Sequence, residues 1–260
     1  MRLRADGRVL RIGHKGAAAL EPENTLRSLA RAVELGVDLV EFDVLDLHDG
    51  TLVLAHSDDL LEVSHGAADG PVRSRTLAEL REVAPELPTL DEALAFMVER
   101  APEVGLHLDL KWLGYEAAVV EAVSRHGVVE RSLVSSFHPE SLREVGRLEP
   151  LLARGLTYPF DRHRLSTRGA LAPVVLGGLV TLRQALPRRI AGLLSRAHAS
   201  VAVLHYNVVT RAVVARCHAL DVPVFAWTVD SPAVVRRLVR AGVDAIVTND
   251  PRILTVTLNT

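Results

Sequence analysis

The chain has 260 residues, of which 48% are hydrophobic, and a formal net charge of −2. This length and apolar content are typical of one large α/β domain, and the small net charge argues against general nucleic-acid binding. The single cysteine excludes an internal disulfide and a cysteine-based zinc site, and the lack of a signal-peptide run or a membrane-length apolar stretch predicts a cytoplasmic protein.

Short apolar runs alternate with segments of helical periodicity along the chain. The expected strands are residues 9–13, 39–45, 106–110, 133–137, 152–158, 201–206, 223–229 and 245–248, with 52–56 extended after the turn signal Asp49-Gly50. The expected helices begin at Asn24 or Thr25, which can act as the N-cap, and at Pro139, and cover residues 76–83, 90–100, 115–126, 211–220 and 232–241.

Strand–helix alternation repeated about eight times predicts a parallel sheet. The regular spacing and total length favour a closed (β/α)₈ TIM barrel, as one domain over residues 1–260, rather than an open doubly wound sheet. The sequence also lacks the motif that usually marks an open sheet of this kind, because no G-x-G-x-x-G follows the first strand. In a barrel, the C-terminal ends of the strands hold the active site.

One segment departs from this strand–helix alternation. Residues 162–200 are longer than a barrel connection needs and carry seven arginines and two histidines around apolar stretches. This composition has two interpretations. The segment is an extra helical region, a pair of helices that covers the barrel, or it is a basic and apolar lid that makes peripheral contact with a membrane surface.

Carboxylates interrupt two of the apolar strands. Side chains two residues apart on a strand face the same way, so Glu41 and Asp43 project together, as do Asp109 and Lys111. If both strands belong to one barrel, three carboxylates converge at its mouth. They repel one another unless a cation lies among them, and hard oxygen ligands suit Mg²⁺ or Ca²⁺. The alternative is that these acids pair with basic side chains or line a solvated rim.

Two histidines, His14 and His56, stand at the ends of apolar segments on either side of the carboxylate pair. Hydrolysis of a phosphodiester needs a base and an acid, and imidazole suits both tasks near neutral pH. Lys15 and Lys111 supply positive charge for the nonbridging phosphate oxygens. Trp227, at the end of a late strand, is either a flat apolar wall for a small polyol or a packing residue at the barrel mouth.

The chain resembles the glycerophosphodiester phosphodiesterase family in an ordered set of motifs that spans residues 13 to 251. The motifs are Gly13-His14-Lys15-Gly16, Pro22-Glu23-Asn24-Thr25, Glu41-Phe42-Asp43-Val44, Asp49-Gly50, Val53-Leu54-Ala55-His56, Asp109-Leu110-Lys111, Ser136-Phe137, Trp227-Thr228-Val229 and Gly242-Val243-Asp244-Ala245-Ile246-Val247-Thr248.

The resemblance implies a (β/α)₈ barrel that uses a divalent cation to hydrolyse glycerophosphodiesters to glycerol 3-phosphate and an alcohol. The implied roles are metal ligation by Glu41, Asp43 and Asp109, acid–base catalysis by His14 and His56, and phosphate contact by Lys15 and Lys111. Three positions depart from the family's usual pattern, which has arginine at Lys15, glutamate at Asp109 and asparagine at Asp230.

Two alternative functions stay open at this point. One is a lysophospholipase D-type enzyme that acts on lysolipids, with residues 162–200 facing the membrane. The other is a non-catalytic barrel that binds phosphorylated ligands. For the phosphodiesterase itself, the sequence does not choose between direct attack by water and attack by the substrate's own hydroxyl through a cyclic phosphate. It also leaves the head group, the preferred cation and the oligomeric state undetermined.

Overall fold

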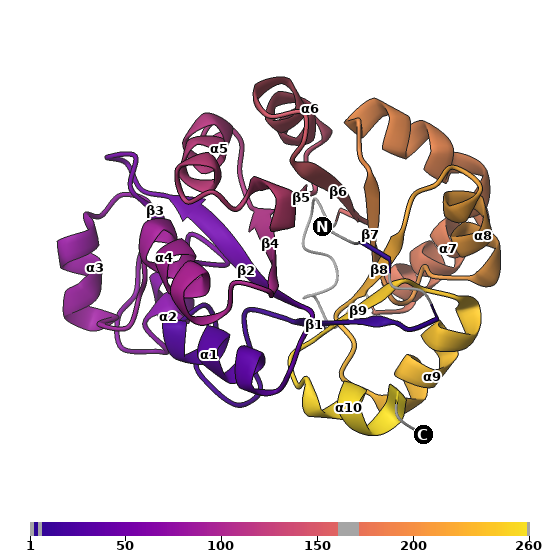
Figure 1. Cartoon of the computed structure of the whole chain (residues 1–260), viewed down its shortest axis with the longest axis horizontal. Helices are drawn as coiled ribbons and strands as arrows, with labels where there is room; N and C mark the ends of the chain where they lie inside the picture. Colours follow the sequence, from indigo (N-terminus) through magenta and orange to yellow (C-terminus); the bar gives the residue numbers. More distant parts are fainter. Residues whose placement is uncertain (1–2, 5–6, 161–171, 259–260) are drawn as a thin grey trace.

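In this computed structural model, which describes residues 3–4, 7–160 and 172–258, parallel strands form a ring with helices around its outside (Figure 1). The strands are β1 (Leu10–Gly13), β2 (Leu39–Asp46), β3 (Leu52–Val53), β4 (Gly105–Leu110), β5 (Ser132–Ser136), β6 (Ala153–Tyr158), β7 (Val201–His205), β8 (Val224–Trp227) and β9 (Ala245–Thr248). The helices are α1 (Leu26–Glu34), α2 (Leu60–Val63), α3 (Leu77–Val83), α4 (Leu90–Arg100), α5 (Glu116–Arg125), a 3₁₀ turn (Val129–Arg131), α6 (Pro139–Leu148), α7 (Ala172–Ala197), α8 (Arg211–His218), α9 (Pro232–Ala241) and α10 (Arg252–Leu258).

The strands close into a barrel. Their order in the sheet is β1-β9-β8-β7-β6-β5-β4-β2-β3, and a further parallel pairing of β1 with β2 completes the ring. Strand β3 stands outside the ring, because it pairs with β2 in the antiparallel direction. The (β/α)₈ fold predicted from the alternation is therefore confirmed, and each predicted barrel strand ends within two residues of the observed one. Helices α2 and α10, of four and seven residues, were not predicted because they are too short to show periodicity.

The helical segment expected around residues 162–200 is, over its described part, the single 26-residue helix α7, in place of the expected pair of helices. Helix α7 connects the adjacent parallel strands β6 and β7, so it occupies the position of a barrel helix. Its apolar side chains Leu186, Ile190 and Leu194 are buried in the core against the barrel. Residues 161–171 lie outside the described residues, and membrane contact by this segment stays a prediction. Within the described ranges, no helix has the length and apolarity needed to cross a membrane.

Strand β2 divides its side chains between two environments. Val40, Phe42 and Val44 pack outward into the core between the strands and helices such as α1 and α4. The two-residue period therefore places Glu41 and Asp43 on the opposite, inner face of the barrel. Burying the three apolar side chains stabilises the barrel, and it also fixes which side of the strand carries the acids.

Strand β4 repeats this division beside β2. Leu106, Leu108 and Leu110 pack outward into the same core, which turns His107 and Asp109 inward. In the parallel pairing of the two strands, Asp43 lies opposite Asp109. The register of the barrel therefore decides that acids from two separate strands meet at one level.

The loop after β1 folds back tightly against α1. Gly16 has a φ of +84°, and a Cβ at this position would lie 2.4 Å from backbone and side-chain atoms of Ser28. Its backbone N–H donates to the carbonyl of Glu41 over 3.0 Å. Only glycine combines this backbone conformation with such a close approach, so Gly16 fixes the turn that places His14 at the end of β1.

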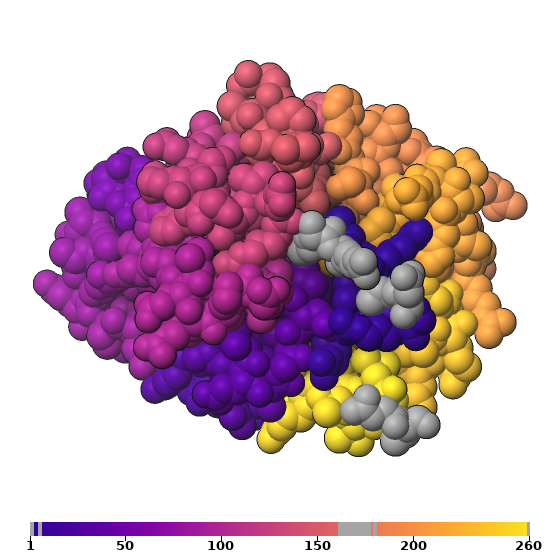
Figure 2. Space-filling view, viewed as in Figure 1, coloured from indigo at the N-terminus to yellow at the C-terminus, as the bar shows by residue number. Residues whose placement is uncertain are grey.

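The N-terminal residues lie at the face of the barrel opposite the strand C-termini. Arg4 forms ion pairs with Asp221 at 3.2 Å and Asp244 at 3.0 Å, and these two aspartates precede β8 and β9. Figure 2 shows the indigo N-terminal residues beside the orange and yellow residues of the last strands and helices.

Candidate active site

A cavity of about 700 Å³ opens at the C-terminal ends of the strands. One part of its wall is charged and the other is apolar and aromatic. The described residues that line it are His14, Glu41, His56, Ser57, Asp59, Glu62, His107, Asp109, Lys111, Ser135, Phe137, Thr157, Phe160, Val203, Trp227, Thr228 and Val247. The cavity therefore lies where a barrel of this kind holds its active site.

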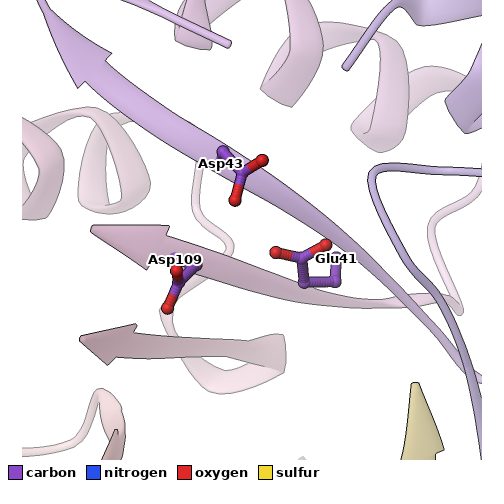
Figure 3. Close-up of side chains that lie close together, drawn as sticks. All are labelled: Glu41, Asp43 and Asp109. Carbon is purple, nitrogen blue, oxygen red and sulfur yellow. The ribbon is translucent and has the colours of Figure 1, made fainter. Parts of the chain in front are cut away.

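Three buried carboxylates gather beside this cavity. Glu41 and Asp43 project from β2 and Asp109 from the neighbouring β4, and their side chains lie close together (Figure 3). One oxygen from each lies within 4.8 Å of the others. The convergence expected from the two-residue period is therefore present in the structure.

Asp43 is fully buried beneath the cavity and is held from several directions. The Asn24 side chain donates from Nδ2 to Asp43 Oδ2 over 2.9 Å and accepts from the Asp43 backbone N–H over 3.0 Å. Thr25, not Asn24, caps α1. Lys111 Nζ lies 2.6 Å from Asp43 Oδ1, and Lys15 Nζ lies 4.0 Å from Oδ2. Although burial opposes ionisation, these cations hold the pKa of Asp43 well below its usual range.

Asp109 is positioned by hydroxyl groups from the next two strands. Ser135 Oγ donates to Asp109 Oδ1, and Thr157 Oγ1 donates to the same oxygen over 3.4 Å. Lys111 Nζ donates to Oδ2 over 2.6 Å. Because the Ser135 hydrogen goes to the carboxylate, His107 Nε2, at 2.8 Å, donates to Ser135 Oγ. Burial lowers the pKa of His107 to about 4, so this ring is neutral and supports Asp109 through Ser135.

Glu41 shows that the cluster carries excess negative charge. Burial and the neighbouring Asp43 raise the pKa of Glu41 well above its usual value. Lys111 and the backbone N–H of Lys15 act in the other direction, and this N–H donates to Glu41 Oε2 over 2.8 Å. One ammonium group, that of Lys111, is shared between Asp43 and Asp109. Three hard oxygen donors with uncompensated charge fit a divalent cation such as Mg²⁺ or Ca²⁺.

His14 has a neutral partner. Its Nδ1 lies 2.6 Å from Asn249 Oδ1, and Asn249 Nδ2 donates to Asp230 over 2.6 Å. This second bond fixes the amide orientation, so the Asn249 oxygen faces His14 and the hydrogen of the ring lies on Nδ1. The other ring nitrogen, Nε2, therefore keeps its lone pair and lies 3.9 Å from Glu41 Oε2. Burial lowers the pKa of His14 to about 4, so the ring is neutral near pH 7.

His56 has a charged partner. Its Nδ1 donates to Glu62 Oε1 over 2.7 Å, and Ser57 Oγ donates to Glu62 Oε2 over 2.6 Å. Burial opposes ionisation of this carboxyl, but the hydrogen bonds from His56 and Ser57 lower the pKa of Glu62 to about 2. His56 therefore faces the cavity with a carboxylate behind its ring.

The three expected substrate contacts differ in their placement. Lys111 and Trp227 line the cavity, and Trp227 Nε1 donates to the carbonyl of Val203 over 3.1 Å. Lys15 is not among the described lining residues. Its side chain is 9% exposed and its Nζ donates to Glu23 over 2.8 Å. Contact between Lys15 and a phosphate stays a prediction.

Sequence reasoning did not find Glu62 or Asn249. Glu62 lies in the four-residue helix α2, where no pattern marks one acid among several. Asn249 immediately follows β9, and a polar residue after a barrel strand is the signal that identifies it as a candidate. Asp230, noted in the sequence only as a departure from the family's usual asparagine, orients the Asn249 amide.

Comparisons with known proteins agree with this geometry. The model of the glycerophosphoryl diester phosphodiesterase family matches residues 14–253. A glycerophosphodiester phosphodiesterase of Caldanaerobacter subterraneus subsp. tengcongensis is 29% identical over 261 residues, which cover 95% of this chain and 96% of the relative. A structure from Silicibacter pomeroyi DSS-3 is 27% identical with a TM-score of 0.80, over 99% of this chain and 95% of that one. An Oleispira antarctica phosphodiesterase, solved in complex with the product sn-glycerol-3-phosphate, is 25% identical with a TM-score of 0.76, over 96% of this chain and 97% of that one.

Proposed function

Because the chain belongs to the glycerophosphoryl diester phosphodiesterase family and is an enzyme of that family, we propose that it hydrolyses glycerophosphodiesters to glycerol 3-phosphate and an alcohol. The observation that carries this proposal is one cavity that is lined by two differently partnered imidazoles and adjoins the carboxylate cluster. The product bound to the Oleispira antarctica relative supports the same reaction.

Glu41, Asp43 and Asp109 would hold the divalent cation, Mg²⁺ or Ca²⁺. When bound, such a cation polarises a phosphoryl oxygen and stabilises the charge that develops on it. Lys111 lines the cavity beside Asp109, so its ammonium group is placed to contact a nonbridging phosphate oxygen. Cytoplasmic location and the extent of the domain to both ends of the chain stay predictions.

His14 acts as the general base in this proposal. Its ring is neutral, its Nδ1 hydrogen is engaged by Asn249, and its Nε2 lone pair is free to accept a proton. The proton comes from the attacking oxygen, which belongs to water or to the neighbouring hydroxyl of the substrate. Attack by water and attack by the substrate hydroxyl both need a base in this position.

His56 acts as the general acid. The Glu62 carboxylate accepts from Nδ1 and so orients the ring, and Nε2–H of the protonated ring would donate a proton to the leaving alkoxide. The two histidines come from separate segments that line the same cavity, which supports roles for them on the two sides of one scissile bond. Trp227 and Phe137, whose rings meet edge to face with centroids 5.8 Å apart, would form an aromatic wall for the glycerol moiety.

Phosphorus-31 NMR of the purified protein with glycerophosphocholine and either cation tests the function. We expect conversion to sn-glycerol 3-phosphate that stops when a chelator removes the cation. A transient cyclic phosphate signal would indicate attack by the substrate hydroxyl, and its absence at every time point would indicate attack by water. Failure to turn over a panel of glycerophosphodiesters with either cation would refute the proposal and favour the non-catalytic barrel.

Asp109→Asn should weaken cation binding at least about tenfold, because ligand charge sets the affinity of oxygen sites for divalent cations. The amide preserves the size of the side chain and an oxygen that accepts from Ser135. Isothermal titration calorimetry with Mg²⁺ and Ca²⁺ measures the effect directly. Glu99→Gln on the outer surface, where the side chain is 74% exposed, is the matched control. An unchanged dissociation constant in Asp109→Asn would remove Asp109 from the ligand set.

A further inference from the structure

The Glu62 carboxylate is the point where three segments of the site meet. It accepts hydrogen bonds from His56 at 2.7 Å and from Ser57 at 2.6 Å, and Lys15 Nζ lies 3.9 Å from its Oε1. Helix α2, which carries Glu62, is capped by Asp59, whose side chain accepts from the Leu61 N–H. The carboxylate is therefore held in place independently of any substrate.

We propose that Glu62 is a positioning residue that orients His56 and fixes its tautomer, an inference that rests on the acid role of His56 in the proposed function. A carboxylate only accepts hydrogen bonds, so the bond to Glu62 fixes the hydrogen on His56 Nδ1. The ring then has one orientation, and Nε2 is the nitrogen that reaches the scissile bond.

The partner of the other histidine shows that this arrangement is specific. His14 is held at the same ring atom, Nδ1, but by the neutral amide of Asn249. Both partners accept from Nδ1 and so leave Nε2 for the cavity, but only the partner of His56 carries a charge.

Lys15 connects this pair to the rest of the charged wall. Its Nζ contacts Glu23 at 2.8 Å, Glu62 at 3.9 Å and Asp43 at 4.0 Å. One ammonium group therefore reduces the repulsion that Asp43 and Glu23 impose on Glu62, and it helps to keep Glu62 ionised.

Glu62→Gln tests the proposal, because the amide has nearly the same shape but no charge. We expect kcat to fall at least about tenfold, the usual effect of losing the partner that orients a functional histidine, with KM nearly unchanged. A merely structural role would lower stability without separating kcat from KM in this way.

Glu86→Gln is the matched control. Glu86 lines the neighbouring pocket together with Glu62, is half exposed, and pairs with Arg27 instead of a histidine. Its replacement should leave kcat, KM and the His56 tautomer as in the wild type. Far-UV circular dichroism and urea unfolding establish that both variants are folded.

Nitrogen-15 NMR of the His56 ring separates failure of this inference from failure of the proposed function. In the wild type we expect the neutral ring to carry its hydrogen on Nδ1, and in Glu62→Gln a hydrogen divided between Nδ1 and Nε2, whatever substrate the enzyme hydrolyses. If the His56 tautomer is identical in both proteins and kcat is unchanged, Glu62 does not act through His56. If the NMR change occurs but no diester is hydrolysed by the wild type, the contact stands and the proposed function fails.

Discussion

Replacing His14 or His56 with alanine lowers kcat by at least ~10²-fold, the usual contribution of a general acid or base. Each ring lines the cavity and is oriented through Nδ1, so Nε2 is the nitrogen that would meet the substrate in the proposed mechanism. In that mechanism, loss of His14 would remove the acceptor for the proton of the attacking oxygen. Loss of His56 would remove the donor to the leaving alkoxide. Steady-state rates with saturating cation and a soluble glycerophosphodiester measure both effects.

His48→Ala provides the control for these two variants. His48 is exposed and its ring contacts only a backbone carbonyl, that of Arg75 at 3.2 Å, among the contacts the structure describes. Its replacement should leave kcat unchanged. Near wild-type kcat in either His14→Ala or His56→Ala would refute the assignment of that residue as a proton-transfer group. A double variant that is no slower than the slower single variant would show that the two histidines act as one unit.

We expect that replacing Asp43 with asparagine will weaken cation binding, as its proposed role as a ligand requires, and will destabilise the fold. Asp43 is fully buried, and its charge is balanced by Lys111 at 2.6 Å and Lys15 at 4.0 Å. Breaking a buried ion pair costs about 3–5 kcal/mol, and we expect about 3 kcal/mol here because Lys111 keeps its second partner, Asp109. Urea unfolding measures the loss of stability, and calorimetric titration with Mg²⁺ and Ca²⁺ measures the loss of affinity.

Asp91→Asn is the matched control for Asp43→Asn. Asp91 also forms an ion pair of 2.6 Å, with Arg125, but its side chain is 57% exposed. Exposed pairs contribute about 0–1 kcal/mol, so this variant should unfold near the wild-type urea concentration and bind cations normally. Wild-type cation affinity in a folded Asp43→Asn protein would exclude Asp43 as a ligand.

The placement of the acids follows directly from the sequence. Val40, Phe42 and Val44 alternate with Glu41 and Asp43, and a strand with this pattern buries its apolar side against helices. The acids must then face the other way. The same reasoning applies to Asp109 on the next barrel strand, because it alternates with leucines. The period of a strand is a local property, so it can be read without knowledge of the rest of the fold.

The partners of the histidines do not follow from the sequence. His14 and its partner Asn249 are 235 residues apart, and they meet because β1 and β9 are neighbours in the closed ring. Glu62 is close to His56 in sequence, but only the folded α2 segment shows that its carboxylate reaches the ring. Asn24 shows the same limit, because a residue with the signature of a helix cap binds Asp43 instead.

The sequence by itself determined the repeating strand–helix units, the inward side of each acidic strand and the ordered motifs of the family. These features depend on periodicity and local spacing, which are properties of short segments of the sequence. Tertiary structure alone decided that the acids from β2 and β4 lie at one level, that Lys111 is shared between two of them, and that one histidine has an amide partner and the other a carboxylate. Those outcomes depend on strand register and barrel closure, which are set by the packing of the whole core.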